Sequence, residues 1–319
     1  MADIGEDIVI AKQLLDSNGL VGIPTETVYG LAGNAFNEDA VLEIFKVKQR
    51  PSFDPLIVHA AGLDQIKSFV KEIPEQAELL VKELWPGPLT VLLKKNSEIP
   101  DLVTSGLDTV AVRVPRHPLT LSLLNSLDYP LAAPSANPFG YISPTKAIHV
   151  DQQLGDSINY ILDGGDCHIG VESTIISFEN DIPTILRLGG QPIERLKEML
   201  GEVKINKHSS SQPDAPGMMK SHYAPSKKLI LSSQSGSLKE YLAEEIGVLV
   251  FGQIHPEIPK FNQYVLSDIG SVDEAAKNLF SAMRELDQKS HIRIIIADAI
   301  PNTGLGKAIN DRLKRASAE

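Results

Sequence analysis

Short apolar runs alternate with amphipathic segments over the first two-thirds of the chain. Apolar runs of about four to eight residues between polar turns are typical of buried strands, whereas apolar positions three and four apart indicate helices. Ile8, Ala11, Leu14 and Leu15 before Asn18 predict a first helix. Strands are expected at Leu20–Pro24, Leu56–His59, Leu89–Leu93, Val110–Pro115, Leu131–Pro134, Tyr160–Leu162, Thr174–Phe178 and Thr184–Leu188, and helices at about 37–48, 62–71, 74–84, 117–126 and 192–200.

The order of these elements predicts an α/β fold with a mixed sheet. Regular alternation of strands and helices would give a parallel sheet, but the strands expected between residues 159 and 188 follow one another without a helix. Strands joined by short turns pair antiparallel. We therefore expect a sheet that is partly antiparallel.

The alternation of apolar runs and amphipathic segments stops between Lys204 and Pro225, where the chain is rich in Ser and Pro. This change predicts a domain boundary. A second cycle then begins, and it is typical of a small doubly wound α/β unit. Its strands are expected at Leu229–Leu231, Val248–Phe251 and Ile292–Ala297, and its helices near 237–245, 271–289 and 306–316.

Composition and charge narrow the functional classes. The chain has 319 residues, 42% of them hydrophobic, and a formal net charge of −11; residues 1–205 carry 16 basic and 28 acidic side chains. Strong binding of nucleic acid through phosphates needs a basic face, so it is not expected, although a local basic pocket remains compatible. We also expect no membrane span and no signal peptide, and the single Cys167 suits a reducing compartment, so a cytoplasmic location is predicted.

Two segments could bind a ligand. Thr25 and Thr27 lie in a polar turn directly after an apolar strand, where open α/β sheets place ligands; an ordinary strand-to-helix connection is the alternative. Lys48 and Arg50 stand where a helix ends before Pro51, and both could reach one anion such as phosphate. A solvated helix C-terminus, which also favours cations, is the alternative there.

Isolated arginines and hydroxyl groups follow further along the chain. Arg113 alternates with valines in its strand, so it is either solvated or placed for a carboxylate. Arg187 stands alone in ILRLGG, and Ser135 and Asn137 lie between prolines. The chain contains no P-loop, GxGxxG, HExxH or GxSxG motif, so any nucleotide must be bound by other means.

Taken in order, these segments resemble the L-threonylcarbamoyladenylate synthase family in its longer, two-domain form. The resemblance implies a YrdC-like catalytic domain with a twisted open mixed sheet at residues 1–204, a linker at 205–228 and a Rossmann-like domain at 229–319. The matching runs are IPTETVYGLAGNAF, KVKQRPSFDPLIVH, WPGPLT, TVAVRVPRH, APSANPFGYISPT, GVESTIIS, ILRLGG, APGMMKSHYAP and GLGKAINDRLKRAS.

The resemblance implies a nucleotidyltransferase that makes threonylcarbamoyl-AMP from L-threonine, bicarbonate and ATP and releases pyrophosphate. A separate transferase complex would then use the product to modify tRNA. Mg²⁺ would enter on the ATP phosphates, without metal ligands from protein side chains. The linker, with Tyr223, is the expected lid over a product that water hydrolyses readily.

The family pattern also assigns binding residues in this chain. It places Thr27, His59, Arg113, Ala133 and Ser173 around L-threonine. It places Arg50, Asp54, Thr109, Ser135, Ser143, Arg187 and Tyr223 around ATP, Lys48 at bicarbonate or phosphate, and Asn137 in support.

One departure and two alternatives remain at this point. Asp54 stands where many relatives carry Asn, so we expect it near the nucleoside or paired with Arg50. A carbamoyl-adenylate domain of a hydrogenase maturation protein is one alternative, but such proteins carry a zinc finger and this chain has one cysteine. An RNA-binding or ribosome-maturation factor without catalysis is the other, and the acidic charge argues against it.

Overall fold

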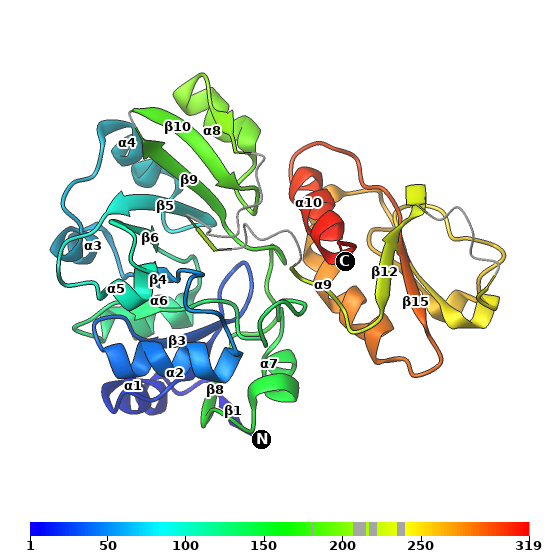
Figure 1. Cartoon of the computed structure of the whole chain (residues 1–319), viewed down its shortest axis with the longest axis horizontal. Helices are drawn as coiled ribbons and strands as arrows, with labels where there is room; N and C mark the ends of the chain where they lie inside the picture. The colour runs from blue at the N-terminus through cyan, green and yellow to red at the C-terminus, as the bar shows by residue number, and fades with distance from the viewer. Residues whose placement is uncertain (180, 207–214, 217–221, 235–239, 319) are drawn as a thin grey trace.

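The computed structural model describes residues 1–179, 181–206, 215–216, 222–234 and 240–318, and these form two sheets (Figure 1). The larger sheet has the strand order β1-β8-β2-β3-β7-β4-β6-β5-β9-β10-β11 and mixes parallel with antiparallel pairs. Its strands are β1 (Asp3–Gly5), β2 (Val21–Ile23), β3 (Gly30–Asn34), β4 (Ile57–His59), β5 (Leu89–Lys94), β6 (Thr109–Arg113), β7 (Leu131–Ala132), β8 (Tyr160–Leu162), β9 (Thr174–Glu179), β10 (Ile182–Arg187) and β11 (Lys204–Ile205).

Helices pack around this larger sheet, and buried aliphatic side chains fill the space between (Figure 1). The first helix is capped by Asp7, whose carboxylate accepts a hydrogen bond from the Val9 amide. The helices are α1 (Ile8–Asp16), α2 (Glu38–Lys48), α3 (Leu63–Phe69), α4 (Glu75–Leu84), α5 (Asp101–Thr104), α6 (Pro118–Asn125), α7 (Ala147–Leu154) and α8 (Ile193–Leu200).

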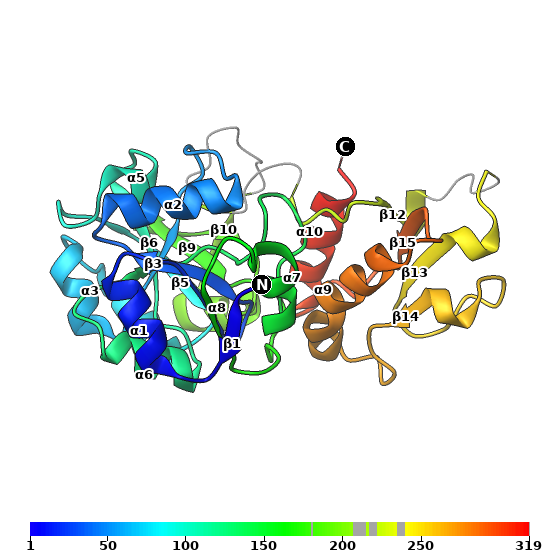
Figure 2. The same ribbon diagram turned by 90° about the horizontal axis from the view of Figure 1, so that it is seen from below.

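The smaller sheet is parallel, in the order β12-β15-β13-β14. Its strands are β12 (Lys228–Leu231), β13 (Ile246–Val250), β14 (Gln263–Val265) and β15 (Ile294–Ala297), and its helices are α9 (Val272–Gln288) and α10 (Gly306–Ala316). Both helices lie between the two sheets (Figures 1 and 2). Parallel strands cannot be joined by tight turns, and α9 makes the crossover from β14 to β15, as is typical of a Rossmann-like unit.

Apolar and polar contacts join α9 and α10 to the first part of the chain. Val28 and Val171 share one buried cluster with Phe280 of α9 and Leu313 of α10. The Tyr141 hydroxyl, 2.6 Å from an oxygen of Asp287, donates a hydrogen bond to it. The second sheet is thus anchored through its helices rather than through its strands.

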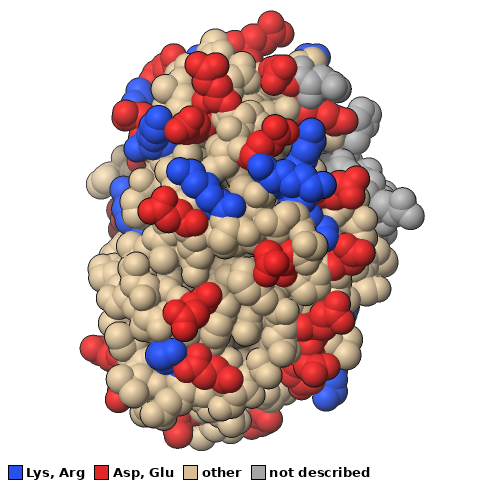
Figure 3. Space-filling model, turned by 90° about the vertical axis from the view of Figure 1, so that its left-hand side faces the viewer, with Lys and Arg blue, Asp and Glu red and all other residues tan. Residues whose placement is uncertain are grey.

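On the face of the larger sheet's domain that is turned away from the smaller sheet, basic side chains stand singly or in small groups among acidic ones (Figure 3). The described part of that face shows no continuous basic surface. No helix among the described residues is long and apolar enough to cross a bilayer.

The predicted fold class is confirmed, and most predicted strands are present within a few residues of their expected positions. The helix expected near 237–245 is wrong for the described residues 240–245, which form only a 3-10 turn at Ala243–Glu245. Leu242 is 68% exposed, so its side chain does not pack into a core as the apolar face of a helix would. Residues 235–239 lie outside the described residues.

A pair of glycine substitutions tests the packing of α9 against the first domain. Gly170 and Gly165 both have left-handed backbones, with φ of 80° and 78°. A Cβ at Gly170 would lie 2.4 Å from the Ala276 carbonyl oxygen, whereas a Cβ at Gly165 meets nothing within 4 Å. Gly170→Ala should therefore lower the free energy of unfolding in urea by roughly 1–3 kcal/mol more than Gly165→Ala does. Equal losses would contradict the close packing of α9.

Candidate active site

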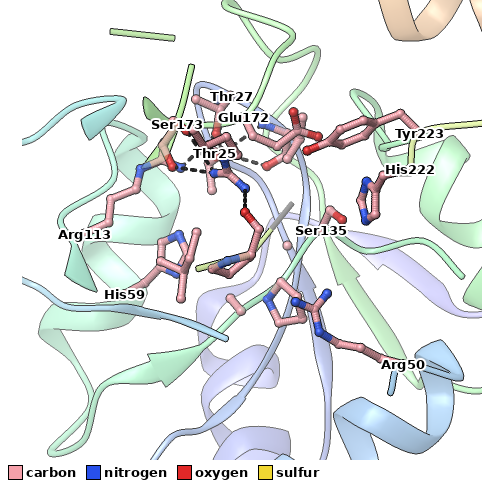
Figure 4. Close-up of a pocket in the computed structure, with 17 residues that line it drawn as sticks. Thr25, Thr27, Arg50, His59, Arg113, Ser135, Glu172, Ser173, His222 and Tyr223 are labelled. Atoms are coloured by element: carbon pink, nitrogen blue, oxygen red, sulfur yellow. Dashed lines mark hydrogen bonds between the residues drawn. The ribbon is translucent and has the colours of Figure 1, made fainter. Parts of the chain in front are cut away.

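A pocket opens on one face of the larger sheet, over its central strands (Figure 4). In the parallel pair β4 and β6, His59 lies opposite Arg113, so both side chains project from the same face. The pocket has about 550 Å³ of empty space, its open mouth included. It is lined by Thr25, Thr27, Val28, Gly30, Arg50, Ile57, His59, Arg113, Ala133, Pro134, Ser135, Glu172, Ser173, Arg187, Pro216, His222 and Tyr223.

The polar segment after β2 forms a turn that its own hydroxyl groups stabilise. The Thr25 hydroxyl accepts hydrogen bonds from the amides of Thr27 and Val28 and donates one to the Val28 carbonyl at 2.6 Å. It also lies 2.8 Å from the Thr27 hydroxyl. This turn fixes the Thr27 hydroxyl at the pocket wall, and the segment leads into strand β3 rather than into a helix. Its contact with a ligand stays a prediction.

Arg113 is buried, and its orientation is fixed by three groups. Its Nη2 forms an ion pair with Glu26 Oε2 at 2.8 Å. Its Nη1 donates to the Thr27 hydroxyl at 2.9 Å, and its Nε donates to the Gly87 carbonyl at 3.2 Å. A guanidinium has five N–H donors, so these contacts leave donors for a ligand in the pocket.

Arg50 and Asp54 form a second buried ion pair. Arg50 comes directly after Gln49, the C-cap residue of α2, which has a left-handed backbone conformation. Its Nη2 lies 2.9 Å from Asp54 Oδ2 and donates to the Pro55 carbonyl at 2.7 Å. Burial raises the pKa of Asp54, and the nearby Arg50 acts in the opposite direction. Of the two positions expected for Asp54, pairing with Arg50 is the one that the structure shows.

Lys48 lies behind the pocket wall rather than in its lining. Its buried ammonium donates to the carbonyls of Ser135 and Asn137, both at 2.5 Å. Burial, followed by the charge of Arg50, lowers the pKa of Lys48 well below its usual value. In this structure Lys48 holds the loop that carries Ser135, and its expected contact with bicarbonate or phosphate stays a prediction.

Arg187 ends β10 and holds the segment before β9. Its Nε and Nη2 donate to the Ser173 carbonyl at 3.0 and 2.9 Å, and Nη2 also donates to the Ser173 hydroxyl at 3.0 Å. Its Nη1 donates to the Pro216 carbonyl at 3.2 Å. Arg187 therefore joins the sheet to the segment expected to form a lid.

Glu172 brings a carboxylate to the same region. Its Oε1 accepts a hydrogen bond from the Ser143 hydroxyl at 2.5 Å, and its Oε2 accepts one from Arg312 Nε at 2.8 Å. Burial tends to raise the pKa of Glu172, but Arg312, Arg187 and Ser143 together outweigh burial and lower it. Glu172 is therefore ionised although it is buried.

Two described pieces of the linker close the pocket from the other side. Ala215 packs with Ile57 and Leu186 on the sheet face, and Pro216 lines the pocket. His222 and Tyr223 also line it, and their rings meet edge to face at 4.1 Å. Residues 207–214 and 217–221 of the expected lid lie outside the described residues.

The structure brings most of the predicted binding residues together. Nine line the pocket: Thr27, Arg50, His59, Arg113, Ala133, Ser135, Ser173, Arg187 and Tyr223. Five do not: Lys48, Asp54, Asn137 and Ser143 contact lining residues or their loops, and Thr109 lies at the opposite end of β6 from Arg113. Their ligand roles stay predictions.

Sequence reasoning missed four residues that shape the site. Glu172, His222 and Glu26 each adjoin a predicted residue, so their position in the motifs was the available signal. Arg312 gave no local signal, because it lies 140 residues from its partner Glu172.

The carboxylates at the pocket are already paired with arginines, which bears on metal binding. Glu26, Asp54 and Glu172 each form an ion pair with an arginine. Among the described residues, no group of three or more His, Cys, Asp or Glu side chains is arranged to hold a metal ion. The expected entry of Mg²⁺ on the ATP phosphates stays a prediction.

Comparison with known proteins gives matches along nearly the whole chain. Residues 13–189 match a family model described as telomere recombination, and residues 192–318 match one described as the threonylcarbamoyl-AMP synthase C-terminal domain. The chain is 41% identical over 325 residues to a threonylcarbamoyl-AMP synthase of Pyrococcus abyssi, covering 97% of this chain and 94% of that one. It is 41% identical over 327 residues to the Bacillus subtilis protein of the same name, covering 97% and 92%.

One solved structure also matches nearly the whole chain. The crystal structure of P. abyssi Sua5 complexed with L-threonine has a TM-score of 0.90 to this chain at 40% sequence identity. The match covers 99% of this chain and 97% of that chain. The likeness therefore extends over both sheets.

The pKa of His59 tests whether water is excluded from the pocket wall. Burial, reinforced by the charge of Arg113, lowers the pKa of His59 from 6.5 to about 3. The unfolded chain binds a proton at His59 below pH 6.5 and the folded chain does not. Stability is therefore complete above pH 6.5 and falls between pH 6.5 and 3.

The quantity to follow is the free energy of unfolding of wild type minus that of His59→Asn. We expect this difference to fall by about 2 kcal/mol when the pH is lowered from 7 to 5. Urea unfolding at both pH values measures this difference, and the other buried histidines cancel in it. The exposed His168 provides the control, since His168→Asn should track wild type. A pH-independent difference for His59→Asn would mean that water reaches the ring.

Proposed function

Since the chain belongs to the two-domain threonylcarbamoyl-AMP synthase family and is an enzyme of that family, we propose that it makes threonylcarbamoyl-AMP from L-threonine, bicarbonate and ATP and releases pyrophosphate. The names of the relatives favour this activity over an RNA-binding factor. The proposal includes a cytoplasmic location and transfer of the product to a separate tRNA-modifying complex.

The observation that carries the proposal is that two arginines, each able to bind an anion, line one pocket. Arg113 stands on β6 beside Thr27, while Arg187 stands at the end of β10 beside Ser173 and Pro216. An arginine fork binds carboxylates and phosphates through paired hydrogen bonds. One ligand with a carboxylate and one with a triphosphate can therefore lie next to each other.

The amino acid would lie on the side of β4 and β6. Arg113 has free donors for its carboxylate, and the Thr27 and Ser173 hydroxyls can bond its polar groups. His59 is neutral at physiological pH, so its ring can bond a substrate hydroxyl without adding charge. Ile57 and Ala133 provide apolar surface suited to the threonine methyl group.

ATP would lie toward Arg50, Ser135 and Arg187, covered by Tyr223. The threonine amine attacks the carbon of CO₂ and loses a proton, or attacks bicarbonate with loss of water, and either route forms a carbamate. A carbamate oxygen then attacks the α-phosphorus, and the bond to pyrophosphate breaks. Mg²⁺ bound to the ATP phosphates would help to neutralise the charge that moves to pyrophosphate.

The residues of the chain would act in this reaction by position and charge. Arg113 and Arg187 hold the two reactants at a fixed distance, which replaces an unfavourable encounter in solution. Arg50 and Arg187 stabilise negative charge on the phosphates. Pro216, His222 and Tyr223 cover the pocket and limit hydrolysis of the mixed anhydride.

Pyrophosphate release by the purified protein tests this function. With ATP and bicarbonate, we expect L-threonine to support a kcat/KM roughly 10-fold or more above that of L-serine, because one methyl group in an apolar pocket contributes about that much selectivity. Omitting bicarbonate should abolish the threonine-dependent rate. Release that is no faster with threonine than with serine, or than without an amino acid, would refute the proposal.

A further inference from the structure

Arg312 is a buried cation from the second domain that lies against the wall of the pocket. It belongs to α10, and its side chain is 0% exposed. Its Nε donates to Glu172 Oε2 at 2.8 Å, its Nη2 to the Leu188 carbonyl at 2.8 Å, and its Nη1 to Asp311 Oδ2 at 2.8 Å. These three hydrogen bonds, one from each nitrogen, fix the guanidinium in one position.

The partners of Arg312 are parts of the pocket or adjoin it. Glu172 lines the pocket and precedes Ser173, and Leu188 follows Arg187. The guanidinium carbon also lies 4.9 Å from the ring centre of Tyr223, a favourable cation–π contact. One side chain of α10 therefore contacts the segment before β9, the end of β10 and the cover of the pocket.

The charge of Glu172 links Arg312 to Arg187. Glu172 is buried, and Arg312 is the largest of the influences that keep it ionised, followed by Arg187. Without Arg312, a buried carboxylate would be left with Arg187 as its nearest strong cation, and an unpaired buried charge is costly. Glu172 would then draw Arg187 away from the Ser173 hydroxyl and the Pro216 carbonyl.

We propose that Arg312 is a positioning residue of the synthase reaction, which pairs with Glu172 so that Arg187 stays directed at the ATP phosphates. This inference rests on the proposed function, in which Arg187 faces ATP. It gives the second domain a part in the active site: α10 supplies the charge that the pocket needs to keep its own carboxylate from competing with the nucleotide.

Steady-state pyrophosphate release by three variants tests this role. Arg312→Gln should raise the KM for ATP roughly tenfold while the KM for threonine changes less than about threefold, which is the size expected for coupling between neighbouring charges. The double variant Arg312→Gln/Glu172→Gln should return the KM for ATP to within about threefold of wild type, because the competing carboxylate is gone. Lys314→Gln, an exposed site on the same helix, is the control and should match wild type.

Equilibrium binding of ATP, measured by calorimetry on the same variants, separates this inference from the proposed function. The expected order of affinity is wild type, then the double variant, then Arg312→Gln, and it does not depend on turnover. If Arg312→Gln binds ATP as wild type does, or if the double variant is no better than the single one, Arg312 has only a structural role. If the three affinities follow this order but wild type releases no pyrophosphate with threonine, only the proposed function is refuted.

Discussion

The site depends on the pairing of buried arginines with buried carboxylates. A charge taken out of water is costly unless a partner and further hydrogen bonds compensate for it. Three separate pairs supply the partners: Arg50 with Asp54, Arg113 with Glu26, and Arg312 with Glu172. Glu26 and Glu172 also accept further hydrogen bonds, whereas the carboxylate of Asp54 has its ion pair alone. Arg187 differs, since it is held by the oxygens of Ser173 and Pro216. The pocket can therefore hold several cations in a strongly acidic domain without losing its shape.

The sheet and the second domain supply the positions that these pairs need. Parallel pairing of β4 with β6 sets His59 beside Arg113, and antiparallel pairing of β9 with β10 brings Ser173 to Arg187. The helices α9 and α10 pack against Val28 and Val171 of the first domain, and α10 contributes Arg312. The second domain thus supports the wall of the pocket through α10, although the lining itself comes from the first domain and the linker.

Sequence reasoning reached most of the strands because their apolar runs are distinct. It missed β3 (Gly30–Asn34), whose two glycines and asparagine give a weak strand pattern. It also missed β1, β11 and β14, which have only two or three residues each and so show no pattern. It predicted Arg113 on the correct face, because alternation along a strand determines the face. It could not show that Lys48 turns to backbone carbonyls behind the wall, or that Arg312 reaches Glu172, because both depend on tertiary contacts between distant segments.

The central claim is that Arg113 and Arg187 bind different reactants in one pocket. The most direct measurement is the KM for L-threonine and for ATP in Arg113→Ala and in Arg187→Ala. A lost hydrogen bond to a charged group corresponds to roughly 10-fold or more in affinity. The account predicts that Arg113→Ala raises mainly the KM for threonine and that Arg187→Ala raises mainly the KM for ATP. Indistinguishable effects of the two substitutions on both substrates would contradict it.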